Sequence, residues 1–198
     1  MSNSPDFAAL ISSRICHDLI SPIGAIGNGV ELLMMDGAGQ GPELALIAES
    51  VANANARIRY FRVAFGPASG DQRIARSEVM SILTDISRGG RLTYAWTSAA
   101  DLPRREVRLV FLLLQCTETA MAYGGRVQVD RDDTGWTIRA TATRLKIDPP
   151  LWEALRDGRA PAEISAGQVH FALAAADVQR LGLHLVTEVR ETSIRFSF

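Results

Sequence analysis

The sequence predicts an α+β protein in which an N-terminal antiparallel helical hairpin is followed by a sheet covered on one face by helices. Apolar residues recur at spacings of three and four in two stretches of residues 4–65, which is typical of helices in a bundle. The small, polar stretch GPASGDQ then marks a linker. Beyond it, helical segments mix with strands that are joined mostly by hairpin turns. We therefore expect a hairpin domain over 1–66, a linker over 67–73 and a mixed domain over 74–198.

The hairpin consists of two predicted helices separated by the cluster GAGQGP at 37–42, which is too rich in glycine and proline to remain helical. Each helix carries an apolar stripe that two helices alone cannot enclose. Dimerisation, with two hairpins forming a four-helix bundle, is the simpler solution, and packing on another domain is the alternative. The stripes are Ala8, Ile11, Ile15, Leu19, Pro22, Ile26, Val30 and Leu33 in the first helix and Leu44, Ile47, Val51, Ala54, Ile58, Phe61 and Phe65 in the second.

The mixed domain alternates between helical periodicity and short β-rich runs. Glycine pairs end two of its predicted helices, and Ser77 is positioned to cap the first of them. The predicted helices span 77–88, 104–122, 151–156 and 168–181, and the predicted strands span 91–97, 126–131, 136–143, 183–189 and 193–198.

Composition excludes several classes of protein. Hydrophobic and charged fractions of 47% and 22% are those of a folded globular chain. A net charge of -1 provides no long-range attraction for nucleic acid or for an anionic membrane. Two cysteines suit a reducing compartment, and the sequence has neither a membrane-spanning apolar run nor the pattern of a signal peptide. We expect a cytoplasmic protein that binds neither nucleic acid nor membrane.

The segment that points to chemistry is CHDLISP, at 16–22. Helical spacing places His17 on a face of polar or small residues, away from much of the apolar stripe, so its imidazole is expected to be exposed. A neutral imidazole with Asp18 beside it is suited to act as a nucleophile on a bulky partner. Spacing alone leaves open the alternative of a structural histidine beside glycines that merely let bundle helices approach. The predicted face comprises Arg14, His17, Ser21, Gly24 and Asn28.

The string His17-Asp18-Leu19-Ile20-Ser21-Pro22 resembles the phospho-accepting H-box of bacterial two-component histidine kinases. In that motif an acidic residue follows the histidine, and Ser or Thr and then Pro stand four and five positions on. The flanks, SSRICHDLISPIGAIGNGVELL at 12–33, resemble the ChpT-type histidine phosphotransferases more closely still. This resemblance covers nearly the whole chain in domain order. It implies a dimeric phosphorelay protein whose hairpin precedes a degenerate Bergerat domain, the ATPase-like α/β sandwich of histidine kinases.

The second domain keeps the frame of a kinase ATP site without its ligands. In the stretch that resembles N-x-x-E-N-A-x-K-Y, at 115–123, Thr119 replaces the asparagine that would hold magnesium, and Ala122 replaces the lysine that would reach phosphate. The D-x-G-x-G box is absent after the strand that begins at 136, and only Ser-Ala-Gly at 165–167 remains of the last glycine-rich loop. We therefore expect this chain to bind no ATP and no metal, so the phosphoryl group has to arrive from another protein.

The resulting hypothesis is a histidine phosphotransferase that acts as a phosphorelay intermediate. His17 accepts a phosphoryl group from a receiver-domain aspartate and passes it to the aspartate of a response regulator. The resemblance implies that the donor is the receiver domain of a hybrid histidine kinase and that Mg²⁺ is held by the receiver. Asp18 is the candidate to orient or deprotonate the imidazole, and Ser21 is the candidate to hydrogen-bond the ring or the phosphoryl oxygens.

Arginines supply further candidates for binding. Arg14 is expected to contact the phosphoryl group or the receiver, with a solvated surface arginine as the alternative, and Gly24 and Asn28 complete the binding face. On the second helix, Arg57, Arg59 and Arg62 are candidate contacts for an acidic receiver surface, but we expect at least two of them to form a solvated helix face.

Two other functions remain open at this level. An ATP-dependent histidine kinase would need the second domain to bind nucleotide, and a non-catalytic dimeric adaptor would use the H-box helix only to dock receivers. His170 and His184 are predicted to be structural. Cys16, His17, Cys116 and His170 have no recognisable spacing of metal ligands.

Overall fold

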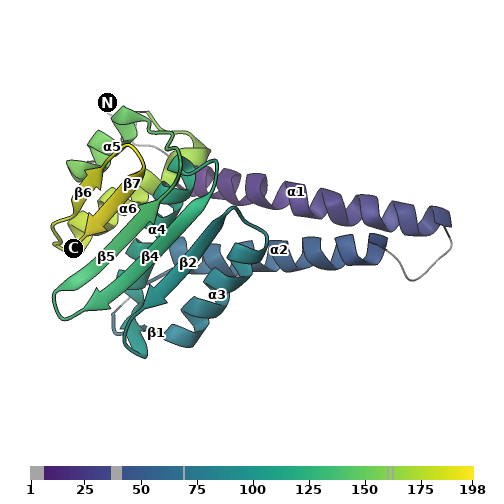
Figure 1. Ribbon diagram of the computed structural model, residues 1–198, viewed down its shortest axis with the longest axis horizontal. Helices are drawn as coiled ribbons and strands as arrows, with labels where there is room; N and C mark the ends of the chain where they lie inside the picture. The colour runs from purple at the N-terminus through teal and green to yellow at the C-terminus, as the bar shows by residue number, and fades with distance from the viewer. Residues whose placement is uncertain (1–6, 37–41, 69, 160, 162) are drawn as a thin grey trace.

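An antiparallel helical hairpin projects from a mixed α/β domain (Figure 1). α1 (Phe7–Asp36) continues as one helix through Pro22, and α2 (Pro42–Ala64) returns alongside it. Residues 37–41 of the predicted break lie outside the described residues; Pro42 begins α2, where the fixed φ of proline suits a first helical position. The computed structural model describes residues 7–36, 42–68, 70–159, 161 and 163–198.

The elements of the second domain are β1 (Arg73–Ala75), α3 (Arg76–Arg88), β2 (Leu92–Thr97), β3 (Asp101–Pro103), α4 (Arg104–Ala120), β4 (Gly125–Asp132), β5 (Gly135–Thr141), α5 (Pro149–Arg156), the short 3₁₀ helix η1 (Ala166–Gln168), α6 (Val169–Arg180), β6 (Val186–Val189) and β7 (Ser193–Ser197). The larger sheet has the strand order β2-β4-β5-β7-β6. Only its β2–β4 pair is parallel within the described residues. The predicted α+β class is confirmed.

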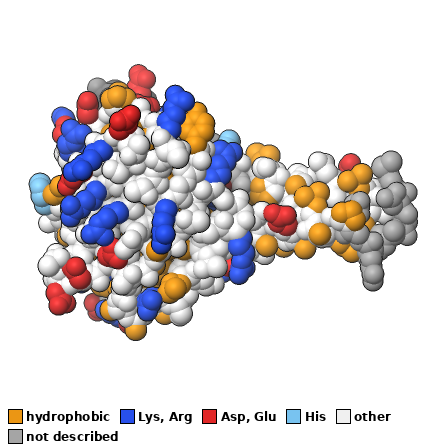
Figure 2. All heavy atoms as spheres, viewed as in Figure 1, with side chains coloured by type: hydrophobic (Ala, Val, Ile, Leu, Met, Phe, Trp, Pro, Cys, Tyr) orange, Lys and Arg blue, Asp and Glu red, His pale blue; other side chains and the backbone are white. Residues whose placement is uncertain are grey.

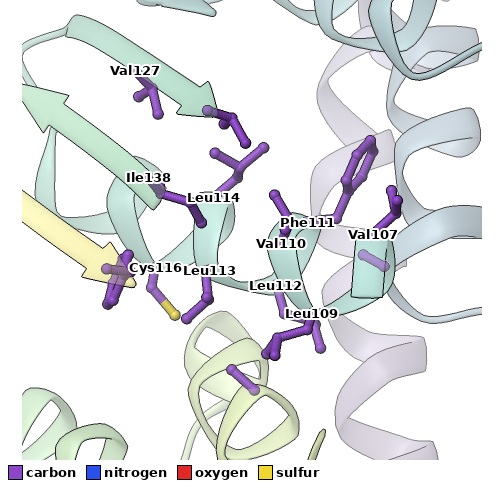
Figure 3. Close-up of a cluster of buried hydrophobic side chains, with 14 of the residues drawn as sticks. Val107, Leu109, Val110, Phe111, Leu112, Leu113, Leu114, Cys116, Val127 and Ile138 are labelled. Carbon is purple, nitrogen blue, oxygen red and sulfur yellow. The ribbon is translucent and has the colours of Figure 1, made fainter. Parts of the chain in front are cut away.

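The core is centred on α4, because this helix is apolar on nearly every side. Its residues from Leu109 to Leu114 are fully buried, and the inward side chains of the sheet, among them Val127 and Ile138, lie over them (Figure 3). Along β4 and β5 buried residues alternate with more exposed ones, which is the pattern of a sheet with one solvated face. Each large apolar side chain buried here contributes about 1.5–3 kcal/mol to stability.

The predicted elements are confirmed to within a few residues, with two corrections. Ser77 is not a helix cap, because α3 begins at Arg76 directly after β1 and its N-cap residue is Ala75. The small sheet formed by β1 and β3 was not predicted, since strands of three residues carry too little pattern to detect. Pairing of these strands holds the chain extended up to Ala75, and the Arg76 N–H donates to the Ala100 carbonyl at 2.8 Å.

α2 is fastened to the second domain by polar contacts as well as by apolar packing. The hydroxyl of buried Tyr60 donates to the Phe111 carbonyl at 2.8 Å. The Arg57 guanidinium forms a two-point contact with Glu118 on α4, with N···O distances of 2.7 and 3.2 Å. Burial lowers the pKa of Arg57, but the hydrogen bond and charge of Glu118, with the charge of Asp18 nearby, outweigh it and raise the pKa above its usual value.

Two of the three arginines of α2 form contacts with the second domain, whereas a solvated position was predicted for at least two of them. Arg59 pairs with Asp85 on α3 at 2.8 Å, and its other terminal nitrogen donates to Ser81 at 3.1 Å. Arg62 alone of the three predicted arginines is exposed. The expectation of a mainly solvated face is wrong for Arg57 and Arg59, because α3 and α4 pack along α2. None of the helices in the described part of the chain has the length and hydropathy needed to cross a bilayer.

Candidate functional site

His17 lies on an open face of α1, and its side chain is 83% exposed. Ser21, Gly24 and Asn28 are also exposed and follow it at helical spacing. A Cβ added to Gly24 would meet no other atom within 4 Å, so a large partner has room to approach. With a rise of 1.5 Å per residue, Asn28 lies about 16 Å along the helix axis from His17. The structure thus keeps Ser21 one turn from the imidazole and places Asn28 beyond its reach.

Asp18 contacts the imidazole although adjacent residues of a helix do not usually face each other. Its Oδ1 lies 3.1 Å from His17 Nδ1. A carboxylate only accepts hydrogen bonds, so Nδ1 carries the hydrogen in this contact, and in the neutral ring Nε2 then has the lone pair. The contact therefore presents Nε2 as the nucleophilic atom of an exposed ring.

Arg14 joins this pair to the second domain. One terminal nitrogen of its guanidinium lies 3.1 Å from Asp18 Oδ2, and the other donates to the backbone carbonyl of Gly167, in η1, at 3.4 Å. The Arg14 side chain is only 18% exposed. Sequence reasoning placed Arg14 on the His17 face but did not find Gly167. That glycine acts through its carbonyl, which every residue type has, so no residue-type signal marks it.

A cleft of about 370 Å³ opens beside Asp18, between α1, α2 and α3. Ser21 and Pro22 line it from α1, and Arg57 lines it from α2. Because Pro22 has no N–H, the Asp18 carbonyl lacks its usual donor four residues on. The cleft thus combines charged and hydrogen-bonding groups next to the His17 face.

His170 lies in the first turn of α6 and is fully buried. Its Nε2 is 3.0 Å from the Thr119 hydroxyl. Burial, together with the charge of nearby Arg14, lowers the pKa of His170 to about 3. His170 is therefore a neutral side chain at physiological pH. His184, by contrast, is exposed and precedes β6.

We expect His170 to make the folded chain less stable in acid. The unfolded chain takes up a proton at His170 near the ordinary pKa of 6.5, whereas the folded chain does so only near 3. Stability from this residue is therefore fully present above pH 6.5 and falls as the pH drops, by about 1.4 kcal/mol per pH unit. The free energy of unfolding, measured with urea at pH 7 and at pH 5, should fall between these pH values in both proteins. The fall should be about 2 kcal/mol smaller for His170→Gln than for the wild type. His184→Gln is the matched control and should retain the wild-type pH dependence; a wild-type difference for His170→Gln would refute the prediction.

The residues at the positions of a kinase nucleotide site do not fit a magnesium nucleotide. The Thr119 hydroxyl donates to the Gln115 carbonyl at 3.0 Å and is paired with His170. Ala122 offers a methyl group where a phosphate would need a cation, and Gly167 turns its carbonyl to Arg14. Among the described residues, no three His, Cys, Asp or Glu side chains gather into a possible metal site.

Comparisons with known proteins show which proteins this chain resembles in sequence and in structure. The family model of the histidine phosphotransferase C-terminal domain matches residues 76–193. The protein phosphotransferase ChpT of Brucella abortus (strain 2308) is 37% identical over 164 residues, which are 80% of this chain and 78% of that protein. A bacterial phosphotransferase solved at 1.7 Å superposes with a TM-score of 0.81 and 34% identity, over 97% of this chain and 95% of that one. The Acinetobacter baumannii histidine kinase AdeS superposes with a TM-score of 0.45 and 11% identity, over 91% and 95%.

Proposed function

This chain belongs to the ChpT-like histidine phosphotransferases, and from that premise we propose that His17 is its phosphoacceptor and that it exchanges phosphoryl groups with receiver domains without using ATP. One observation carries the proposal. The His17 ring is 83% exposed, and its Nδ1 contacts Asp18. This leaves Nε2 free on a face where small neighbours let another domain approach.

The proposed reaction begins with a receiver whose aspartate carries a phosphoryl group. The Nε2 lone pair of His17 attacks phosphorus in line, the bond from phosphorus to the aspartyl oxygen breaks, and its electrons leave with the carboxylate. Asp18 stays hydrogen-bonded to Nδ1–H and stabilises the positive charge that the ring gains. Attack by the carboxylate of a second receiver reverses these changes. We expect Ser21, one turn further along α1, to donate a hydrogen bond to a phosphoryl oxygen.

The identities of the donor and the acceptor are part of the proposal. We infer that the donor is the receiver domain of a hybrid histidine kinase and that response regulators are the acceptors, as the H-box resemblance implies. Mg²⁺ is expected on the receiver, as the same resemblance implies. The cytoplasm remains the expected location of the exchange.

We also propose that the active form is a homodimer, because the hairpin leaves two apolar stripes exposed. On α1, Ile20 and Ile23 are 68% and 59% exposed. They continue through Gly27 to Val30 at spacings of three and four. On α2, Leu44, Val51 and Ile58 repeat every seven residues and are each about 40% exposed. Figure 2 shows hydrophobic side chains gathered along the projecting hairpin. Such heptad stripes are those of a helix pair that completes a four-helix bundle with a second copy.

The test is label transfer from a receiver domain that has been charged with radiolabelled acetyl phosphate and then desalted. We expect the wild-type chain to take up label that is acid-labile and base-stable, as phosphohistidine is. A parallel sample with labelled Mg-ATP and no receiver should remain unlabelled. Label from Mg-ATP would identify an ATP-dependent histidine kinase instead, and failure with several receivers would favour an adaptor that only docks them.

A further inference from the structure

The second domain holds the phosphoacceptor helix through a chain of polar contacts that begins in the remnant of the last glycine-rich loop. The Gly167 carbonyl accepts from Arg14, Arg14 is paired with Asp18, and Asp18 contacts His17 Nδ1, with distances of 3.4, 3.1 and 3.1 Å. Three links thus connect a backbone atom of the second domain to the ring of the proposed nucleophile. Arg14 is the only side chain in the series that touches both domains.

The surroundings of Arg14 suit a fixed guanidinium. Its Nε is buried, and its side chain is 18% exposed, so it has little freedom to reach outward. His170 lies close enough for the charge of Arg14 to act on it. Because His170 stays neutral, it does not repel the guanidinium. Thr119, at the position where a kinase would hold magnesium, fixes the His170 ring from α4.

Asp18 needs such a counter-charge because its side chain is only 11% exposed. A mostly buried carboxylate without a cation is costly, and it reorients toward water or toward another positive group. Arg57 is a second cation whose charge interacts with that of Asp18 in the structure. If Arg14 were removed, Asp18 would be free to turn toward the cleft that Arg57 lines and to leave His17 Nδ1.

We propose that Arg14 is a positioning residue, through which the ATPase-like domain holds Asp18 and thereby the His17 ring in the orientation that phosphoryl transfer requires. This inference rests on the proposed role of His17 as phosphoacceptor. It assigns a task to a residue of the glycine-rich loop that remains from a nucleotide site: the Gly167 carbonyl anchors α1 through Arg14. It also places Arg14 behind the reacting ring, in contrast to its expected contact with the receiver or the phosphoryl group.

Kinetics can separate positioning from receiver binding. Initial rates of transfer should be measured against receiver concentration for wild type, Arg14→Met, Arg14→Lys and the control Arg73→Met. Arg73 also forms an ion pair, with Asp101 in the β1–β3 sheet, but it has no link to His17. For Arg14→Met we expect kcat to fall on the order of 10- to 100-fold while KM stays unchanged. The kcat of Arg14→Lys should lie between those of the wild type and Arg14→Met, because an ammonium group lacks the two terminal nitrogens with which a guanidinium reaches two acceptors. Arg73→Met should match wild type.

A double-mutant comparison tests whether Arg14 acts through Asp18. If it does, Arg14→Met should cost little more in the Asp18→Asn background than Asp18→Asn costs alone. In the free protein, the ¹⁵N spectrum of the His17 ring should show a smaller fraction of the Nδ1–H tautomer in Arg14→Met than in wild type. The His17→Ala spectrum identifies the signal among the three histidines of the chain.

The outcomes are distinct. The inference would be overturned if Arg14→Met had the kcat and the tautomer fraction of the wild type. A rise in KM alone would also overturn it and would make Arg14 a contact for the receiver. If Arg14→Met does not fold, Arg14→Lys carries the test in the same two measurements. If the wild-type chain takes no label from any receiver, the proposed function fails, whereas the tautomer measurement still reports whether Arg14 positions the ring.

Discussion

Replacing His17 by alanine is expected to abolish phosphoryl labelling by a charged receiver. His17 is the only histidine in the sequence of α1, and its neighbours on the same face are poor nucleophiles, because Ser21 carries a hydroxyl and Asn28 an amide. The side chain is 83% exposed, so its loss should change stability by no more than about 0.5 kcal/mol. The measurement compares the label bound to wild type and to His17→Ala after gel electrophoresis, with equal amounts of folded protein.

Asp18→Asn is expected to slow phosphoryl transfer without abolishing it. The amide has nearly the same shape but no negative charge, so it stabilises the cationic ring less well. We expect the transfer rate to fall on the order of 100-fold without disappearing. His184→Ala is the control, because that histidine is exposed and lies in the other domain, and it should be labelled as wild type. Residual label in His17→Ala equal to wild type would locate the phosphoacceptor elsewhere.

The second large effect concerns the oligomeric state. Val51→Glu combined with Ile58→Glu puts two carboxylates on the exposed stripe of α2, and each would be buried twice in a symmetric bundle. Burying an unpaired charge costs several kcal/mol, so the dissociation constant of the dimer should rise by at least about 1,000-fold, or about 4 kcal/mol. Light scattering should give wild type twice the 21.5 kDa chain mass and should give the double variant the mass of one chain.

A matched control separates loss of the stripe from the general effect of a surface carboxylate. Met80 on α3 is 41% exposed, as much as Val51, but lies outside both stripes. Met80→Glu should therefore leave the mass unchanged. A monomeric wild-type chain would refute the homodimer. A double variant that stays dimeric would show that the dimer interface lies outside the α2 stripe.

The long elements could be predicted because their patterns are local. The apolar spacing of α1 and α2 and the alternation along β4 and β5 are set by residues a few positions apart. The prediction that each hairpin helix carries one apolar stripe with one role was less accurate than the prediction of the helices themselves. In α2 its members divide: Leu44, Val51 and Ile58 are exposed, whereas Ala54 and Phe61 are buried. A periodicity marks which residues are apolar, but it does not say which partner covers each edge of the stripe.

The sequence by itself determined the string that resembles an H-box and predicted the open face around His17, because both depend on residue types at fixed local spacing. Only the tertiary structure decided how that motif is held. Arg14 meets Gly167 across 153 residues, and Thr119 meets His170 across 51 residues. Contacts of this kind depend on how α1 packs against η1 and α6, and one of them uses a backbone carbonyl that leaves no mark in the sequence.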